Sequence, residues 1–454
     1  MTEPTQMRTH NLSVIVGLLV GLTAVAISNP SSVQDTPINV ALAGKYFREA
    51  ESASSRDGGR LWGVALYGPM LFVDPNTRFV VANQVDKNGA LRREGEVFGG
   101  KLPEEVGIAN TAVTWSGVQW TMVVWPVPEE RQARVRLMTH ELFHRVQNGI
   151  NLPASDVVNR QLDQRDGRIW LRLEWRALER ALYEQGAARK EAITDAMYFR
   201  RHRHSLFPTA MKDEAALEIN EGLAEYTGVK LSSRSDAEGA ARAGYALRQA
   251  VFRQSFARSF AYATGPAYGI LLDAASKDWR RNVKAGSDLS VMLQAAMNIQ
   301  LQSKTSAELV LARANLYDGD EVIAAETERE NHRRETVAKY RARLLEGPVL
   351  VLPVKGSFNY SFDPNTVTPL DDTATIYPTL RVTDEWGLLE VSDGALMFRD
   401  NGKVTKLQVT APTDTQKPPL QGSGWKLTLN EGWKIVEGER KGDFAIRKET
   451  QANQ

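Results

Sequence analysis

The sequence contains no cysteine, and this absence excludes several classes of protein at once. Disulfide-rich scaffolds, iron–sulfur proteins, cysteine-ligated zinc sites and cysteine nucleophiles all require thiols. Histidine is also scarce, with six residues among 454. Any metal must therefore be held by aspartate, glutamate or one of these few histidines, so the places where histidine occurs are informative.

The chain also lacks an excess of charge of either sign. It has 56 lysines and arginines against 55 aspartates and glutamates, which gives a net charge of +1. A protein that binds nucleic acid through its phosphates needs a basic excess, so no nucleic-acid partner is expected. The short basic cluster Arg200–His204 does not change this expectation, because such runs are typical of a solvated helix face.

One apolar run stands out near the N-terminus, at residues 12–27. It is short for a membrane-spanning helix, which needs about 20 residues. Arg8 precedes the run, and small residues occur at its end, as in a secretory signal peptide. We therefore expect residues 1–28 to be a signal peptide and the protein to be exported, to the periplasm, the medium or the cell envelope. The alternative is an uncleaved membrane anchor formed by residues 12–27.

The composition of the remaining chain changes twice, which predicts three parts and an α+β fold class. Residues 38–127 combine one short helix with β-rich segments separated by turn residues, so we expect a β-rich N-terminal lobe. Residues 128–346 are rich in alanine, leucine, arginine and glutamate, which predicts a helical lobe. Residues 347–454 alternate β-rich runs with turn residues, which predicts an all-β domain of sandwich or barrel type.

The most informative motif is HELFH at residues 140–144. The local pattern predicts a helix from Pro128 that ends at Asn148-Gly149. Residues four apart on a helix share one face, so His140 and His144 could hold one zinc ion. Glu141, beside the first histidine, is placed to act as general base toward a water molecule at that metal.

A zinc site needs a third protein ligand, and the residues leave its identity open. A second predicted helix, ending at Gly228, carries three glutamates on one face with no lysine between them, at positions 218, 221 and 225. Like charges at this spacing repel, and a bound cation would offset the repulsion. Competing ligands are available in the intervening helices, namely Glu174, His202 and His204. The metzincin pattern is excluded, because it would require glycine at 147 and histidine at 150.

HELFH followed by NEGLAEY at 220–226 resembles the gluzincin peptidases, the group that contains thermolysin and the zinc aminopeptidases. The resemblance implies a zincin-like catalytic domain, made of the β-rich lobe and the helical lobe, with one zinc ion. It implies that Glu221 is the third ligand beside His140 and His144. It further implies that Glu225 holds His140 by its other ring nitrogen, a partner that metal-bound imidazole favours.

The stretch YATGPAY at 262–268 is similar to a tyrosine motif of the zinc aminopeptidases. This similarity implies that Tyr262 donates to the oxyanion formed during hydrolysis, with Tyr268 as the reserve. Two features depart from the family. Glu221 lies 77 positions after His144, far more than in the best-known members, and the β-rich region lacks the GAMEN-type motif that binds a free N-terminus.

We therefore expect zinc-dependent hydrolysis of a peptide or protein substrate, with exo- or endo-action left open. The alternatives are a zinc hydrolase of a non-peptide acyl bond and a catalytically silent binding or scaffold protein of the envelope. The strand expected at Val118–Trp125, directly before the HELFH helix, would be the edge to which an extended peptide pairs. The sequence does not predict the oligomeric state.

Overall fold

The computed structural model describes residues 38–449 apart from residues 156, 303–305, 357, 364–365 and 372. The leader expected at residues 1–28 therefore lies outside the described residues. The chain is 46% helical and 22% strand, which confirms the α+β class. In the part of the chain that is described, no helix combines the length and the apolar character needed to cross a membrane.

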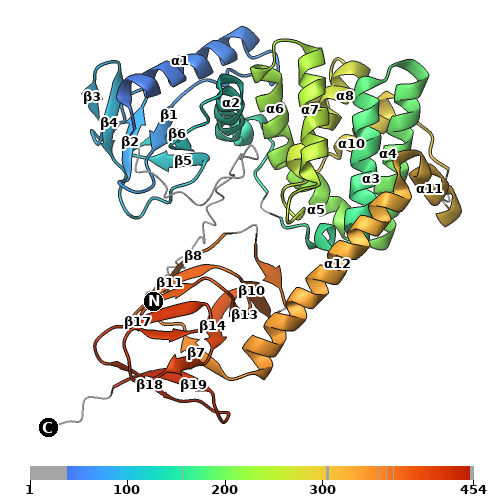
Figure 1. Cartoon of the computed structure of the whole chain (residues 1–454). Coiled ribbons are helices and arrows are strands. Elements are labelled where there is room, and N and C mark those ends of the chain that lie inside the picture. The colour runs from blue at the N-terminus through green and yellow to red at the C-terminus, as the bar shows by residue number, and fades with distance from the viewer. Residues whose placement is uncertain are drawn as a thin grey trace, which may run out of the picture. The chain divides into compact units, whose positions relative to one another are not determined.

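The chain forms two compact units. The first unit runs to Gly319, apart from residues 253–255, and the second contains Arg253–Ser255 and the residues from Asp320 onward. The long helix α12 (Gly319–Arg341), drawn in orange in Figure 1, thus groups with the second unit rather than with the helices that precede it.

The N-terminal part of the first unit is one six-stranded sheet in the order β3-β4-β2-β1-β6-β5. Its strands are β1 (Met70–Val73), β2 (Phe79–Ala82), β3 (Arg92–Glu94), β4 (Val97–Lys101), β5 (Thr111–Trp115) and β6 (Val118–Val124). Helix α1 (Val40–Asp57) lies across this sheet (Figure 1). It packs on β1, where the rings of Phe47 and Phe72 stack 4.6 Å apart. Helix α2 (Arg131–Gln147) packs against β5 and β6.

The expectation that Val118–Trp125 forms an edge of the sheet is wrong. Strand β6 lies between β1, to which it pairs in parallel, and β5, to which it pairs antiparallel. Most of its residues are buried, as in strands with neighbours on both sides. The edge beside α2 is instead β5.

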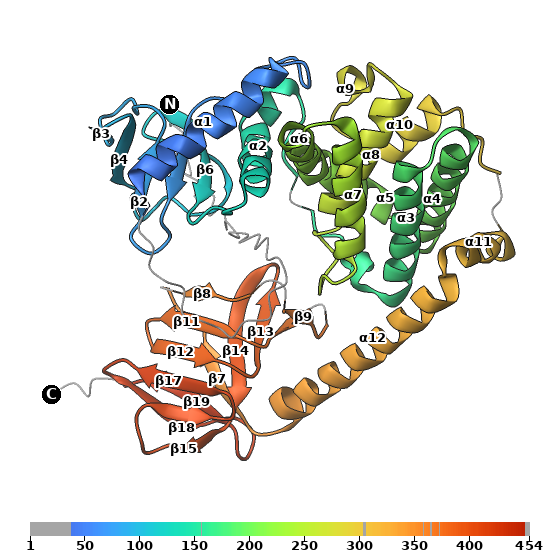
Figure 2. The same ribbon diagram turned by 45° about the horizontal axis from the view of Figure 1, so that its top comes forward.

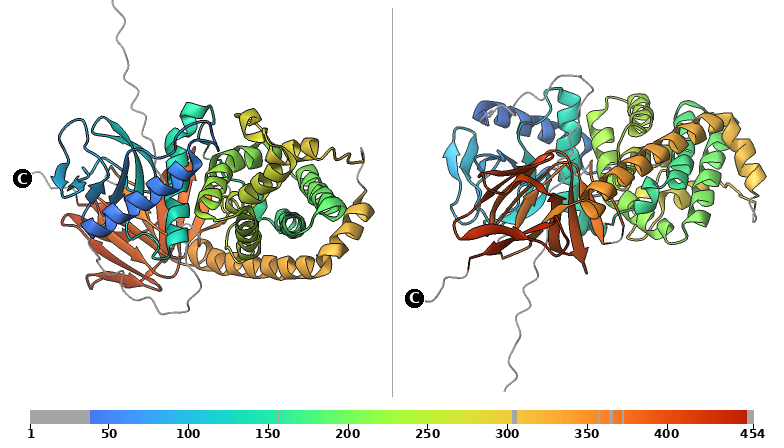
Figure 3. Two further views of the ribbon diagram at one scale, coloured as in Figure 1. Left: turned by 90° about the horizontal axis from the view of Figure 1, so that it is seen from above. Right: turned by 60° about the horizontal axis from the view of Figure 1, so that its bottom comes forward.

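The rest of the first unit is helical, and its helices pack side by side as a bundle (Figures 2 and 3). Helices α3 and α4 make the most extensive contact, and α8 packs on α6 and α7. The bounds are η1 (Asn148–Ile150), η2 (Arg160–Asp163), α3 (Arg165–Tyr183), α4 (Gly186–Leu206), α5 (Ala210–Leu217), η3 (Glu218–Gly222), α6 (Leu223–Ser232), α7 (Asp236–Ala250), α8 (Ala261–Ala275), α9 (Trp279–Asn282), α10 (Leu289–Ala296), α11 (Ala307–Ala314) and η4 (Asn315–Tyr317).

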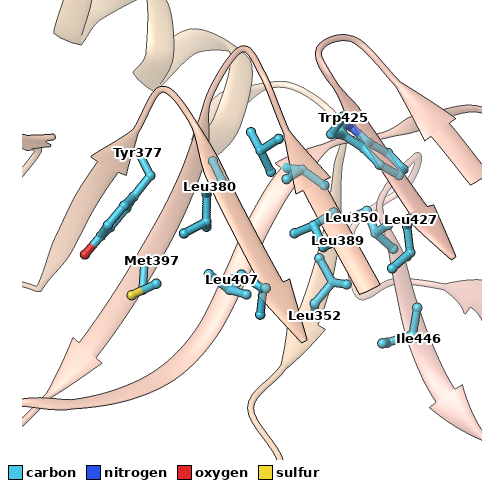
Figure 4. Close-up of a cluster of buried hydrophobic side chains, with 14 of the residues drawn as sticks. Leu350, Leu352, Tyr377, Leu380, Leu389, Met397, Leu407, Trp425, Leu427 and Ile446 are labelled. Carbon is cyan, nitrogen blue, oxygen red and sulfur yellow. The ribbon is translucent and has the colours of Figure 1, made fainter. Parts of the chain in front are cut away.

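The second unit has two sheets after α12 and the short η5 (Ala342–Glu346). One has the order β18-β19-β7-β14-β13-β10-β9 and the other β15-β16-β17-β12-β11-β8. The two sheets enclose one buried cluster, with Leu352 and Leu407 from the first sheet and Leu389 and Leu427 from the second (Figure 4). This arrangement is that of a β-sandwich. The bounds are β7 (Val349–Pro353), β8 (Asn359–Ser361), β9 (Thr368–Pro369), β10 (Ala374–Tyr377), β11 (Leu380–Asp384), β12 (Gly387–Val391), β13 (Ala395–Asp400), β14 (Lys403–Thr410), β15 (Pro412–Asp414), β16 (Leu420–Gly422), β17 (Trp425–Leu429), β18 (Trp433–Glu437) and β19 (Phe444–Lys448).

Candidate metal centre

Helix α2 presents the two histidines of HELFH on one face. It begins at Arg131 rather than at Pro128, because the carboxylate of Glu130 caps it by accepting from the backbone N–H groups of residues 132 and 133. The helix runs to Gln147 without a break. The ring centroids of His140 and His144 consequently lie 4.9 Å apart on successive turns.

The glutamates at 218, 221 and 225 lie on a helical segment that is interrupted by one π-helical turn. This turn, η3, carries Glu221 and separates α5 from α6. Turns of this kind are rare and often occur at functional sites. The expected helix end at Gly228 is wrong, because α6 continues to Ser232. Gly228 instead allows a close approach to α2, since a Cβ there would lie 2.7 Å from the carbonyl oxygen of Arg136.

The structure brings His140, His144 and Glu221 together as a group that could bind a metal ion. The two Nε2 atoms of the histidines are 3.1 Å apart, and the Oε2 atom of Glu221 is 3.5 Å from each of them. Ligands bonded at about 2.0–2.1 Å to a tetrahedral ion are separated by about 3.3 Å. The three atoms therefore already have the spacing of one face of a tetrahedral metal site.

The electrostatics of this group favour a positive charge at its centre. Burial opposes protonation of His140, yet the carboxylates of Glu221 and Glu225 raise its pKa to about 10. Burial also opposes ionisation of Glu221, yet its hydrogen bonds with both histidines hold its pKa well below the usual value. A metal ion would take the place of the proton between these groups.

Each histidine is held by its other ring nitrogen. The Nδ1 atom of His140 is 2.9 Å from Oε2 of Glu225, whose other oxygen is 3.1 Å from Arg136. Burial opposes ionisation of Glu225, but Arg136 and the histidine keep its pKa below the usual value. The Nδ1 atom of His144 is 2.8 Å from Oε1 of Gln147. Such partners orient imidazole ligands and fix their tautomers.

Glu141 is a buried carboxylate beside this group, with 5% of its surface exposed. Its Oε2 atom is fully buried and has no hydrogen-bond partner among the described residues. Burial raises the pKa of Glu141, which the two neighbouring histidines partly oppose. A buried carboxylate oxygen without a partner calls for an explanation, and a ligand or water in the site would supply one.

The two tyrosines of the YATGPAY stretch have separate surroundings. The Tyr262 hydroxyl donates to Oε2 of Glu221 over 2.6 Å, and its ring stacks on His140 with centroids 5.6 Å apart. Burial and the charge of Glu221 raise the pKa of Tyr262 well above its usual value, so its hydroxyl stays a proton donor. The Tyr268 hydroxyl donates instead to Glu174 over 2.6 Å, away from the group of His140, His144 and Glu221, which is called the metal group below.

The competing ligands have other partners. Glu174 and Glu218 are fully buried and paired with Arg200, and Glu174 also pairs with Arg203. His204 is 3.0 Å from Glu214, and the ring of His202 packs on Trp170. Glu218 therefore does not share a face with Glu221 as expected. The π-helical turn begins at Glu218 and changes the angular relation between the two residues.

Sequence reasoning missed three residues around the group. Arg136 pairs with Glu225, and Gln147 contacts Nδ1 of His144. Arg258 has a guanidinium nitrogen 3.6 Å from Oε1 of Glu221. A usable signal existed for the first two. Arg136 precedes His140 by four residues and Gln147 follows His144 by three, which places them near the histidines on a helix. Arg258 precedes α8, and no pattern marks it.

Helix α8 reaches the metal group through a contact between two glycines. A Cβ at Gly222 would lie 3.0 Å from the Cα atom of Gly265, and a Cβ at Gly265 would overlap the backbone of Gly222. This contact joins the turn that carries Glu221 to the helix that carries Tyr262. It explains why glycine occurs three residues after Tyr262.

We expect Gly265→Val to destabilise the fold and to displace Tyr262. The added side chain must push α8 away from η3, and overpacking of this kind costs about 1–3 kcal/mol. Thermal unfolding measures the loss. Gly149→Ala is the matched control, since a Cβ there would meet nothing within 4 Å. A Gly265→Val protein as stable as the wild type would contradict the contact.

Comparisons of the chain with protein-family models, with curated proteins and with solved structures find no match.

Proposed function

We propose that this protein is a zinc metallopeptidase of gluzincin type, which hydrolyses peptide bonds in a peptide or protein substrate. The observation that carries the proposal is the buried Oε2 of Glu141, which has no hydrogen-bond partner among the described residues and lies beside the group of His140, His144 and Glu221. A purely structural metal site has no use for such a carboxylate, whereas hydrolysis needs a base next to the metal.

Zinc is the metal that the donor set favours. Two imidazoles and one carboxylate are a common ligand set of catalytic zinc, which keeps one position for water. When bound, zinc would polarise the substrate carbonyl and make water a stronger nucleophile at neutral pH. The proposal includes a zincin-like fold for the first unit. It is supported by the order of elements along the chain, in which the sheet comes first, the helix with HELFH follows, and the segment with Glu221 comes later.

The residues of the chain then have distinct roles. Glu141 takes the proton of the attacking water, and its raised pKa suits a group that must also give this proton to the leaving amine. Tyr262, whose hydroxyl donates to Glu221 in the structure, would turn this hydrogen bond to the carbonyl oxygen as negative charge develops there. Glu225 and Gln147 keep the two histidines oriented.

The substrate has a place to bind beside α2. Strand β5 is the edge of its sheet and packs against this helix. The free backbone groups of an edge strand can pair with an extended peptide, which would lie beside the helix that carries His140 and His144. The sequence at residues 1–28 leads us to place this activity outside the cytoplasm, in the periplasm, the medium or at the envelope.

The direct test is hydrolysis by the purified protein with and without metal. We expect an unfolded protein substrate to be cleaved, the activity to disappear after chelation and dialysis, and stoichiometric zinc to restore it. N-acyl and ester substrates are assayed in parallel. Activity on these alone would favour the non-peptide hydrolase, and a zinc-loaded protein inert toward every substrate would favour the binding or scaffold protein.

A further inference from the structure

The partner of Nδ1 of His144 is the amide of Gln147, whereas the partner of His140 is a carboxylate. The direction of the hydrogen bond between Gln147 and His144 is therefore not fixed by the residue type alone. An amide can accept through its oxygen or donate through its nitrogen, so Gln147 could in principle stabilise either tautomer of His144. Only the tautomer with hydrogen on Nδ1 leaves the lone pair of Nε2 for a metal. Something must therefore fix how the Gln147 amide is turned.

Gln147 belongs to a chain of buried hydrogen bonds that answers this question. Its Nε2 atom lies 3.0 Å from Oδ1 of Asn220, and Nδ2 of Asn220 lies 2.9 Å from the backbone carbonyl oxygen of Ser155. The same Nδ2 atom is 3.3 Å from Oε1 of Glu221. Gln147 is 1% exposed and Asn220 is 5% exposed, so water does not compete for these bonds.

The acceptors that Asn220 contacts fix the direction of every hydrogen bond in this series. The carbonyl oxygen of Ser155 can only accept, and so can the ionised carboxylate of Glu221. Asn220 must therefore turn its NH₂ group toward them and its oxygen toward Gln147. Gln147 must then donate its own NH₂ to Asn220 and turn its oxygen to His144, whose Nδ1 is left as the donor.

We propose that Gln147 is a positioning residue that, anchored through Asn220 on the Ser155 carbonyl, presets the tautomer of His144 that binds metal. The proposal rests on the zinc site of the proposed function, but not on the bond that is hydrolysed. His140 reaches the same state by a different route, because Glu225 can only accept and is held by Arg136. The amide of Asn220 thus contacts the proposed ligand Glu221 directly and orients the proposed ligand His144 through Gln147.

The test compares two replacements of Gln147, both of which remove the NH₂ group that donates to Asn220. Glutamate keeps an acceptor for Nδ1 of His144, whereas methionine has a similar size and no comparable acceptor. We expect Gln147→Met to weaken zinc binding about 10–100-fold, as loss of such partners does. Gln147→Glu should bind zinc more tightly than Gln147→Met. Chelator competition measures zinc affinity, and the visible spectrum of the Co²⁺-loaded protein reports the geometry of the site. Gln249→Met, at an exposed glutamine, is the matched control.

A second measurement needs no variant at Gln147. Long-range ¹H–¹⁵N correlation spectra of the zinc-free wild type, recorded where the ring is neutral, should show hydrogen on Nδ1 of His144. The signal is assigned by its loss in His144→Gln. Hydrogen on Nε2 would overturn the proposal, as would Gln147→Met with the zinc affinity of the wild type or Gln147→Glu as damaged as Gln147→Met. A wild type that binds zinc but hydrolyses no peptide would defeat the proposed function alone.

Discussion

Replacing Glu141 by glutamine should leave zinc bound and reduce peptide hydrolysis by about 100-fold or more. The three proposed ligands are untouched, and glutamine has nearly the size of glutamate, so the site should keep its shape. Glutamine cannot take a proton from the attacking water. The measurements are the zinc content of the purified variant and kcat/KM on the same protein substrate.

The control for Glu141→Gln is Glu129→Gln, which removes an exposed carboxylate just before α2 begins at Arg131. We expect this control to keep both zinc and activity. If the zinc-loaded Glu141→Gln protein turned over at the wild-type rate, Glu141 would have no part in the reaction, and its unpartnered oxygen would need another explanation.

The second large effect concerns Glu218 and Glu221, which are three positions apart. We expect loss of one to affect zinc binding and loss of the other to affect the stability of the fold. Glu221→Ala leaves two histidines as ligands and should abolish zinc binding at micromolar metal. Glu218→Ala removes no ligand, but it deprives the buried Arg200 of its closest partner. Breaking a buried ion pair costs about 3–5 kcal/mol when the remaining charge is left alone, and the cost here should be smaller because Arg200 keeps Glu174 as a partner. Zinc content and thermal unfolding of the metal-free protein measure the two effects.

Glu225→Ala is the intermediate case for this pair of variants. It removes the carboxylate that holds His140, for which a loss of about 10–100-fold in zinc affinity is expected. A Glu221→Ala protein that binds zinc like the wild type would show that the third ligand is another residue. A Glu218→Ala protein with full stability would show that the buried pairing with Arg200 contributes nothing.

The helical and β-rich parts of the chain could be predicted because their signals are local. The spacing of His140 and His144 needs only helical geometry, and turn residues separate the strands of the first sheet. The identities of Glu221 and Glu225 as partners of the histidines came from a resemblance to a family. From the residues alone, the third ligand stayed open among acids and histidines of several helices.

What could not be predicted depends on contacts between distant segments. The order of strands in a sheet is one such property, so β6 was expected at an edge although β1 pairs with it. Gly228 looked like a helix end, but its role is to let α6 approach Arg136. Regular α-helical geometry makes Glu218 equivalent to Glu221, and no residue pattern predicts the π-helical turn that contains both.

The unequal spacing of the ligands along the chain has a consequence for how zinc would protect the fold. His140 and His144 stay four residues apart even in an unfolded chain, whereas Glu221 lies 77 positions further on. The denatured protein would thus keep some affinity for zinc, and metal bound there offsets part of the stabilisation gained by the native state. The rise in melting temperature on adding zinc would then report only the extra zinc affinity of the native state. This extra affinity comes from Glu221 and from the hydrogen bonds of Glu225 and Gln147 to the histidines.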